Sequence, residues 1–288
     1  MKIFLNLCVY SIAFFWVVTC KSQSFLNAGA FQIGGGSSSL LGDLGGSKGK
    51  GSNFIKDLDA ESVRFSLNMA ADWTWSNQIE YRANISFIFL NADDKYSGES
   101  SRRMRNLSVN TSIYEITPTL KYNFFKGGNT LKKWTKNEST NIYLTMGTGI
   151  IFFNPGAQYN NRNYNLKHLT TEGQGLSGGA KNYSRVSVVI PIGIGVRRDV
   201  NSKVSVFFEF TVRKCFTDYL DDVSTTYYNN ASLAALNGED AAALADRNTS
   251  GFVQPQGVKR GNPGKNDSYF TMSFGYRKAL NFFGKRLI

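Results

Sequence analysis

Apolar and polar residues alternate over long stretches of the chain. From Ser62 to Trp75, the odd positions hold mostly large apolar side chains and the even positions hold polar or small ones. The same period of two recurs over Ile79–Asn91, Val186–Arg197 and Val204–Arg213. Because successive side chains of a β-strand point to opposite faces, this period predicts four long strands, each with one apolar face.

Weaker alternation predicts four further strands, which are Phe25–Gly36, Leu107–Phe125, Asn141–Asn154 and Asp267–Leu280. Within Leu107–Phe125 the apolar positions change phase between Ile113 and Ile116, which predicts a β-bulge near Tyr114 and Glu115. All eight segments exceed the roughly 5 to 6 residues typical of strands in soluble sheets. They reach the roughly 9 to 11 residues that a tilted strand needs to cross a membrane.

Short and long connections alternate between the predicted strands. The short ones are Ser76–Gln78 and Val200–Ser202, with Lys126–Thr140 of moderate length; the long ones are Ser37–Glu61, Ala92–Asn106, Pro155–Ser184 and Phe216–Asn266. Outer-membrane barrels have short periplasmic turns and long outer loops. The sequence therefore predicts an all-β fold, an eight-stranded antiparallel up-and-down transmembrane β-barrel with long loops. A soluble sandwich or lipocalin-like barrel is the alternative, because the period alone leaves open which face points inward.

Two features favour the membrane barrel. Aromatic residues lie near the strand ends, at Trp73, Trp75, Tyr81, Phe124, Phe125, Phe152 and Phe153. The polar faces also carry charges of both signs, and an eight-stranded barrel has an interior that side chains can fill. The expected charge network of the lumen consists of Arg64, Asp72, Glu80, Arg82, Glu115, Lys121, Arg197, Glu209 and Arg213. Buried charges need partners, so we expect these residues to pair with one another and to leave no porin channel.

The N-terminal segment has the pattern of an export signal. Met1-Lys2 precedes the apolar run Ile3–Val18, and the small residues Cys20 and Ser22 follow. We therefore expect a signal peptide at 1–22, the barrel with its loops at 23–280 and a C-terminal tail at 281–288. A membrane anchor is the alternative, and a lipoprotein cleavage box ending at Cys20 is a second one.

Charge and composition narrow the possible partners. The chain has 33 Lys+Arg and 21 Asp+Glu, a net charge of +12, together with 14 Tyr and 22 Phe. An exported barrel would direct this charge at lipid phosphates or acidic partner surfaces, so we expect contact with outer-membrane lipids and none with nucleic acid. Removal of a signal peptide would leave Cys215 as the single thiol, which excludes an internal disulfide.

Residues suited to catalysis or metal binding are few. His168 is the only histidine, so a Ser/His/Asp enzyme at the barrel rim would depend on it. Cys215 has no second cysteine or histidine nearby in sequence. Asp218, Asp221 and Asp222 offer carboxylates to a Ca²⁺ ion, but their spacing does not match a calcium loop. We expect no catalytic residue, no cofactor and no metal.

Two loop stretches carry a family resemblance, Thr171-Glu172-Gly173-Gln174-Gly175 and Thr217-Asp218-Tyr219-Leu220-Asp221-Asp222-Val223-Ser224. With Ile190–Gly195, Arg247, Arg260-Gly261 and Asp267, the chain resembles the PorG-type outer-membrane proteins of the type IX secretion and gliding motility machinery. The resemblance implies a small, non-enzymatic barrel in the outer membrane. It also implies association with a periplasmic ring made of a lipoprotein and its partner protein. The chain departs from the family pattern at Ser37–Asn53 and in its tail.

The two loop stretches, with Arg247, are called the signature loops below. Their expected role is to contact a partner or to order the loops, and the residues concerned are Thr171, Glu172, Gly173, Gln174, Gly175, Thr217, Asp218, Tyr219, Asp221, Asp222 and Arg247. The long-loop rule places these loops outside the cell, whereas the implied ring is periplasmic. They therefore meet another outer-membrane component, or cap the barrel, or the orientation is reversed. Ala231–Ala245 predicts a short helix on the rim.

Three functions remain open from the sequence. The first is a non-enzymatic barrel that anchors or tethers the periplasmic ring complex. The second is a lipid-modifying enzyme of the barrel rim that uses His168. The third is a surface adhesion barrel, which would bind through the long loops.

Overall fold

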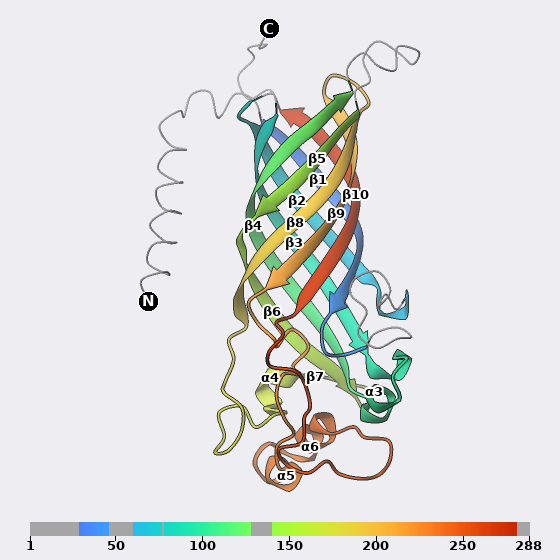
Figure 1. Cartoon of the computed structure of the whole chain (residues 1–288), viewed down its shortest axis with the longest axis vertical. Coiled ribbons are helices and arrows are strands. Elements are labelled where there is room, and N and C mark those ends of the chain that lie inside the picture. Colours follow the sequence, from blue (N-terminus) through green and yellow to red (C-terminus); the bar gives the residue numbers. More distant parts are fainter. Residues whose placement is uncertain (1–28, 46–59, 77, 128–139, 281–288) are drawn as a thin grey trace.

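The chain folds into a closed antiparallel β-barrel with all its long loops at one end (Figure 1). The computed structural model describes residues 29–45, 60–76, 78–127 and 140–280. The barrel strands are β1 Gly29–Leu41, β2 Arg64–Thr74, β3 Ile79–Asp93, β4 Ser108–Gly127, β5 Thr140–Gly147, β6 Gly149–Tyr159, β8 Val186–Asp199, β9 Val204–Cys215 and β10 Ser268–Leu280. β5 and β6 flank Thr148 and both pair with β4 and β8, so together they form one of eight barrel positions.

The pairing of the first and last strands closes the barrel. β1 pairs with β10 from Gly29 opposite Leu280 to Leu41 opposite Ser268, and every other strand pairs with its neighbours along the chain. No edge is therefore left open, which satisfies the backbone hydrogen bonds of a strand in lipid. The predicted eight-stranded antiparallel barrel is confirmed.

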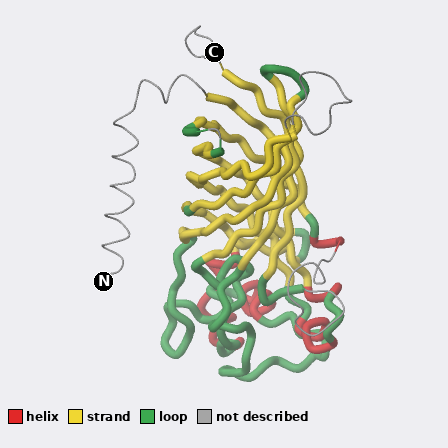
Figure 2. Tube along the Cα trace, turned by 45° about the horizontal axis from the view of Figure 1, so that its top comes forward, coloured by secondary structure: helices red, strands yellow, loops and turns green. Residues whose placement is uncertain are grey.

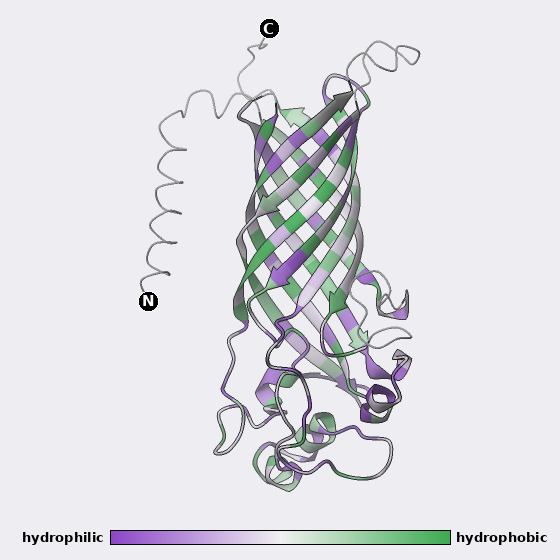
Figure 3. Ribbon diagram, in the orientation of Figure 1, coloured by the Kyte–Doolittle hydropathy of each residue, from purple (hydrophilic) through white to green (hydrophobic). Residues whose placement is uncertain are grey.

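The apolar faces of the strands point outward and the polar faces point inward. Ile85, Ile116 and Ile194 are exposed, whereas Glu80 and Thr117 are buried. Figure 3 shows the resulting alternation of hydrophobic and hydrophilic positions along the barrel strands. A soluble barrel would have the reverse arrangement, so the soluble alternative is wrong, and the exposed apolar band is the surface that outer-membrane barrels present to lipid.

The predicted bulge near Tyr114 and Glu115 is wrong. β4 keeps one register with β3 from Ser108 to Tyr122, and its only register shift lies between Asn123 and Phe125. The change of apolar phase has another cause: Ile113 points into the barrel and is buried, whereas Ile116 points outward and is exposed. The strand stays regular while the environment on its two sides changes.

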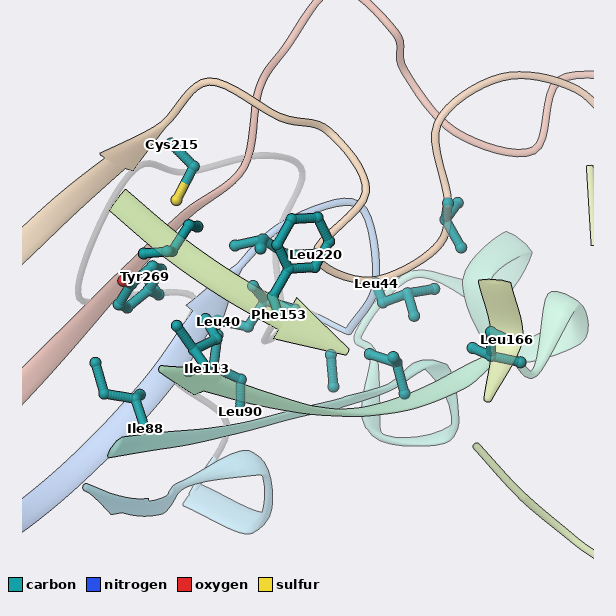
Figure 4. Packing of buried hydrophobic residues seen from close by; sticks show 14 of the residues in the cluster. Leu40, Leu44, Ile88, Leu90, Ile113, Phe153, Leu166, Cys215, Leu220 and Tyr269 are labelled. Atoms are coloured by element: carbon teal, nitrogen blue, oxygen red, sulfur yellow. The ribbon is translucent and has the colours of Figure 1, made fainter. Parts of the chain in front are cut away.

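The inside of the barrel divides into two regions. Towards the short turns, the inward side chains are mostly polar or charged, with Phe207 among the exceptions. Towards the long loops they form an apolar core, called the mouth core below, which includes Leu40, Leu44, Ile88, Leu90, Leu107, Val109, Ile113, Ile151, Phe153, Val189, Cys215, Leu220, Val223, Leu244 and Tyr269. Figure 4 shows that Leu220 enters this core from the loop after β9. Phe153, expected at a lipid-facing strand end, lies in it instead.

The long loops fold into a cap beyond the strand ends. The cap contains η3 Asp94–Tyr96, α3 Ser100–Arg105, β7 Arg162–Asn165, α4 Leu166–Leu169, α5 Asn230–Asn237 and α6 Glu239–Ala245, and η2 Ala60–Ser62 precedes β2. Its helices gather at the loop end of the barrel (Figure 2). The one helix predicted over Ala231–Ala245 is two, because Gly238 between them adopts a φ of 92°, which an L side chain rarely adopts.

The short turns and the described chain ends, Gly29 and Leu280, lie at the opposite end of the barrel (Figure 1). β1 extends to Leu41, five residues beyond its predicted end. The predicted signal peptide, Cys20 and the predicted tail fall outside the described residues. Within the described ranges, no helix is long and apolar enough to cross a membrane.

Candidate functional site

The charged part of the lumen is one connected network centred on Arg82. The Arg82 guanidinium donates to Asp72 on β2 at 2.8 Å and to Glu209 on β9 at 2.7 Å. It also donates to Gln32 on β1 at 3.1 Å. Asp72 faces Arg82 directly across the β2–β3 pair, whereas Glu209 lies on the far side of the lumen. Arg82 therefore spans the barrel interior.

Lys121 and Arg197 extend this network towards the short turns. Lys121 Nζ lies 2.9 Å from Asp72 and 3.2 Å from Glu80, and Arg197 contacts Glu80 at 3.0 Å. Arg277 on β10 was not among the residues predicted for the lumen. It joins the network through a salt bridge of 3.1 Å with Asp72. The sequence could have indicated this, because Arg277 lies on the same polar face of its strand as Thr271 and Ser273.

Tyr143 fills the centre of this region. Its hydroxyl donates to Glu209 at 3.0 Å, and Lys121 Nζ lies 4.6 Å from its ring centroid. Gly195 stands between Tyr143 and Glu209 in the strand register. A Cβ atom at Gly195 would lie 2.3 Å from the Tyr143 ring, so this glycine gives the ring its space. The side chains fill the lumen here, as expected for an eight-stranded barrel.

A second charged pair lies between this network and the mouth core. Arg213 on β9 contacts Glu115 on β4 at 2.7 Å, and the Tyr269 hydroxyl also donates to Glu115. Arg64 was expected in the lumen, but it is exposed and donates to the carbonyl oxygens of Glu61 and Val63. It stands at the first residue of β2, opposite Ser38 of β1 at the loop end of the strand.

In the cap, Glu172 of the first signature loop holds the second one. Its carboxylate accepts hydrogen bonds from the backbone N–H of Ser224 at 2.9 Å and of Thr225 at 3.0 Å. Arg260 completes the contact with a salt bridge of 3.0 Å and also donates to the Asp222 carbonyl oxygen at 2.6 Å. Glu172 and Arg260 are 88 positions apart in sequence and both are buried.

Asp222 links the same loops from the other side. Its carboxylate accepts hydrogen bonds from the Thr171 and Tyr183 hydroxyls. The Tyr183 ring stacks on Tyr219, with 4.3 Å between ring centroids. Burial raises the pKa of Asp222 to about 6, against the lowering effect of Arg260. The two signature loops therefore bind each other.

A group of aspartates lies between the cap and the strand ends. Asp221 accepts from the backbone N–H of Asp43, Leu44 and Val223, and Asp267 accepts from that of Leu220. Burial, reinforced by the charge of Asp43, raises the pKa of Asp221 to about 8 and that of Asp218 to about 7. Burial and the nearby Asp221 also raise the pKa of Asp267. The raised pKa values favour the protonated forms of these carboxyl groups, which lessens the repulsion between them.

The remaining signature residues have smaller contacts. Gln174 is buried and accepts from the Glu172 backbone N–H, and Thr217 accepts from that of Tyr219. Gly173 has a φ of 67° and packs against the Tyr228 ring so closely that an added Cβ atom would lie 2.4 Å from it. Gly175 is exposed. Arg247 donates to the Ser108 hydroxyl at 2.8 Å. Most of these side chains thus face other parts of the cap, and the geometry favours the loop-ordering role.

The described residues form no arrangement that supports the catalytic or the metal-binding alternative. His168 is exposed on α4 and, among the described residues, makes no hydrogen bond or ion pair. Cys215 is a free thiol buried in the mouth core. Within the described ranges, no group of three or more His, Cys, Asp or Glu side chains is placed to hold a metal ion. Asp222 turns away from Asp221, so the three aspartates of this loop do not converge.

Comparison with known proteins gives one family match. The family model described as "Domain of unknown function (DUF6089)" matches residues 8–245. No curated protein matches the chain. Solved structures similar to it include Neisserial surface protein A, at 10% identity and a TM-score of 0.38 over 87% of this chain and 96% of that chain. OprG from Pseudomonas aeruginosa has 11% identity and a TM-score of 0.39 over 88% and 97%.

A third similar structure is Ail, the attachment invasion locus protein of Yersinia pestis, at 10% identity and a TM-score of 0.34 over 88% of this chain and 99% of that chain. At these values the fold assignment rests on the strand pairing of the chain itself.

Proposed function

The chain belongs to the family described as "Domain of unknown function (DUF6089)", and we propose that it is a non-enzymatic anchor in the outer membrane. The complex that it anchors is the type IX secretion and gliding machinery, through a periplasmic ring made of a lipoprotein and its partner protein. The residues of the signature loops support this assignment by resemblance. The filled lumen is the structural observation that carries it.

A filled lumen favours anchoring over transport. The network of Arg82, Lys121 and Tyr143 spans the barrel interior, and all three side chains are buried. Passage of a solute would have to separate several buried ion pairs, which costs several kcal/mol for each charge left unpaired. A rigid, sealed barrel is suited to hold a position in the membrane and to present its two ends to other proteins.

The short-turn end is the side we assign to the ring. Short turns face the periplasm in outer-membrane barrels, and the signature loops at the other end are occupied with each other. At the short-turn end, the turn between β8 and β9 lies against β10, where the Ala279 N–H donates to the Lys203 carbonyl oxygen at 2.8 Å. Lys203 and Lys278 are exposed there beside the exposed Val200. This short-turn surface, Val200 with Lys203 and Lys278, offers two cations and an apolar side chain to the ring.

The test is export in cells that lack the protein. We expect the deletion to abolish secretion through this machinery and to stop gliding, and the intact gene to restore both. The tagged protein, extracted from outer membranes in mild detergent, should carry the ring lipoprotein and its partner at a constant ratio. Intact export from the deletion strain would overturn the proposal.

Charge reversal at the short-turn surface sharpens this test. A Lys203→Glu/Lys278→Glu variant should still insert as a barrel, seen as a faster band on unboiled gels, but should lose most of the co-purified ring. Lys259→Glu is the matched control, since Lys259 is exposed in the cap at the other end. Equal loss of the ring in both variants would place the contact elsewhere.

A further inference from the structure

A short loop at the far side of the cap is held in one conformation by its own side chains. Asp246 Oδ2 accepts from the backbone N–H of Gln254 at 2.6 Å, and Asp246 Oδ1 accepts from that of Asn248 at 3.2 Å. Asn248 in turn accepts from the Ser250 N–H at 2.9 Å. These bonds close residues 246–254 into a fixed loop whose tip contains Phe252.

This fixed loop exposes two adjacent large apolar side chains. Phe252 is 62% exposed and Val253 is 59% exposed. The loop is joined to α3, because the Thr249 N–H donates to the Met104 carbonyl oxygen at 3.0 Å, and the Met104 side chain is itself 50% exposed. An ordered apolar patch in water costs free energy in the free protein, and such patches mark interaction sites. Because the loop is already ordered, it would lose little conformational entropy when a partner binds it.

Cations without a carboxylate partner flank the patch. Arg103 on α3 is exposed and donates to the Ser97 carbonyl oxygen at 2.7 Å. Arg247, at the start of the fixed loop, donates to the Ser108 hydroxyl. Among the described residues neither guanidinium forms a salt bridge, unlike Arg102, which pairs with Glu99 at 3.5 Å. Asp246 belongs to the same loop, but its carboxylate is bonded to the loop's own N–H groups. The exposed Arg103 and the half-buried Arg247 are therefore cations beside the patch that have no acidic partner within the described ranges.

We propose that Met104, Phe252 and Val253, flanked by Arg103 and Arg247, form a docking surface, called the tip surface, for a protein with carboxylates around an apolar socket. The argument for an acidic protein is charge complementarity together with the need of Phe252 and Val253 for a dry pocket. A sugar phosphate would satisfy the arginines but would leave both apolar side chains in water. The lipid band lies on the barrel wall, whereas the tip surface lies in the cap beyond it.

This inference rests on the proposed function in one respect: it gives the anchored machinery a second contact, at the barrel end opposite the ring. It also explains how the cap can serve a partner although most signature residues, Arg247 apart, face other parts of the cap. The two signature stretches at 171–175 and 217–224 order the cap, and the neighbouring fixed loop, with α3, presents the binding residues.

Site-specific photocrosslinking in living cells tests the proposal. A photoreactive phenylalanine at position 252 should crosslink to a single protein at least about fivefold more strongly than the same group at position 236. Leu236 on α5 is the matched control because it is also 62% exposed and also lies in the cap. The crosslinked peptide should contain Asp or Glu residues next to apolar ones.

Charge reversal identifies the chemistry of the partner. Arg103→Glu should lower the crosslink at position 252 by about threefold or more, and reversing an acidic residue of the crosslinked peptide to Lys should restore it. Arg185→Glu, at an exposed arginine elsewhere in the cap, should leave it unchanged. A crosslink to lipopolysaccharide, equal crosslinking at 252 and 236, or no effect of Arg103→Glu would each overturn the proposal.

The outcome is separable from that of the proposed function. If the deletion abolishes export but a Phe252→Ser/Val253→Ser variant exports normally and position 252 gives no preferred crosslink, the anchor stands and the tip surface fails. If the deletion leaves export intact while position 252 still shows the charge-dependent crosslink, the tip surface stands and the secretion role fails. Faster migration on unboiled gels verifies that each variant inserted as a barrel.

Discussion

The two regions inside the barrel are filled by opposite chemistries. Near the short turns, ion pairs such as Arg82 with Glu209 fill the lumen; near the long loops, Leu220 and its apolar neighbours do. The strands are the same, but their surroundings differ. Where the outer face meets lipid, it takes the apolar side chains and the inner face is polar. Towards the long loops the inner face is apolar as well, although outward neighbours such as Phe89 and Phe152 are also apolar and exposed. The change of phase between Ile113 and Ile116 therefore marks the start of the mouth core on β4.

The two regions also differ in the contacts that hold their side chains in place. The charged lumen is built from neighbouring strands, so its geometry follows from the strand register. The mouth core and the cap depend on contacts between loops distant in sequence, such as that of Glu172 with Arg260. We therefore expect the lumen to control insertion and stability of the barrel, and the cap to respond locally.

The largest effect is expected from Arg82→Ala. Removing this cation leaves the buried Glu209 with two hydrogen-bond partners among the described residues, the Tyr143 and Thr211 hydroxyls, which should lower the free energy of unfolding by about 3–5 kcal/mol. Urea unfolding in detergent, followed on unboiled gels, measures it. The double variant Arg82→Ala/Glu209→Gln should recover part of the loss, because it removes the unpaired charge. A loss below about 1 kcal/mol in the single variant would contradict the network.

Leu220→Ala should have the next largest effect and a different readout. The side chain is fully buried in the mouth core, so the cavity should cost about 2–4 kcal/mol. We expect faster proteolysis of the long loops with the barrel itself still resistant. Leu236→Ala, at an exposed leucine of the cap, should change the rate little. Unfolding of the whole barrel by Leu220→Ala would show that cap and lumen are one cooperative unit.

The cap should also be less stable at alkaline pH. Burial raises the pKa of Asp218 to about 7 and that of Asp221 to about 8. The folded cap therefore binds more protons than the unfolded chain between about pH 4 and 8, and its stability should fall as pH rises through that window. Proteolysis of the loops, corrected for the pH dependence of the protease on an unfolded substrate, should be faster at pH 8 than at pH 5. Asp218→Asn should reduce this difference; an unchanged pH dependence would contradict it.

The smallest effect is expected from His168→Ala. His168 is exposed on a four-residue helix and makes no hydrogen bond within the described ranges, so we expect unchanged stability, export and lipid composition. Mass spectrometry of outer-membrane lipids, compared between wild type, variant and deletion strain, measures the last of these. A lipid change common to the variant and the deletion strain would revive the enzyme hypothesis.

Some residues of the charged lumen and of the cap could be predicted from the sequence. Asp72 and Arg82 lie on polar faces that a period of two identifies, and the TEGQG and TDYLDDVS stretches stood out as motifs. The pairing of Glu172 with Arg260 was not accessible, because no local pattern connects residues 88 positions apart. Arg277 itself was accessible to prediction as well, because it shares the polar face of its strand with Thr271 and Ser273. Its pairing with Asp72 was not, since that contact forms only when β10 closes onto β1.

The sequence by itself determined the strands, their number and the alternation of short and long connections, because backbone geometry fixes a period of two wherever a strand forms. The tertiary structure decided which face is inside, since that depends on whether lipid or water lies outside. It decided that Ile113 belongs to the mouth core and that Arg64 leaves the lumen. It also decided that the signature loops bind each other, because hydrogen bonds between distant loops form only when barrel closure brings the strand ends together.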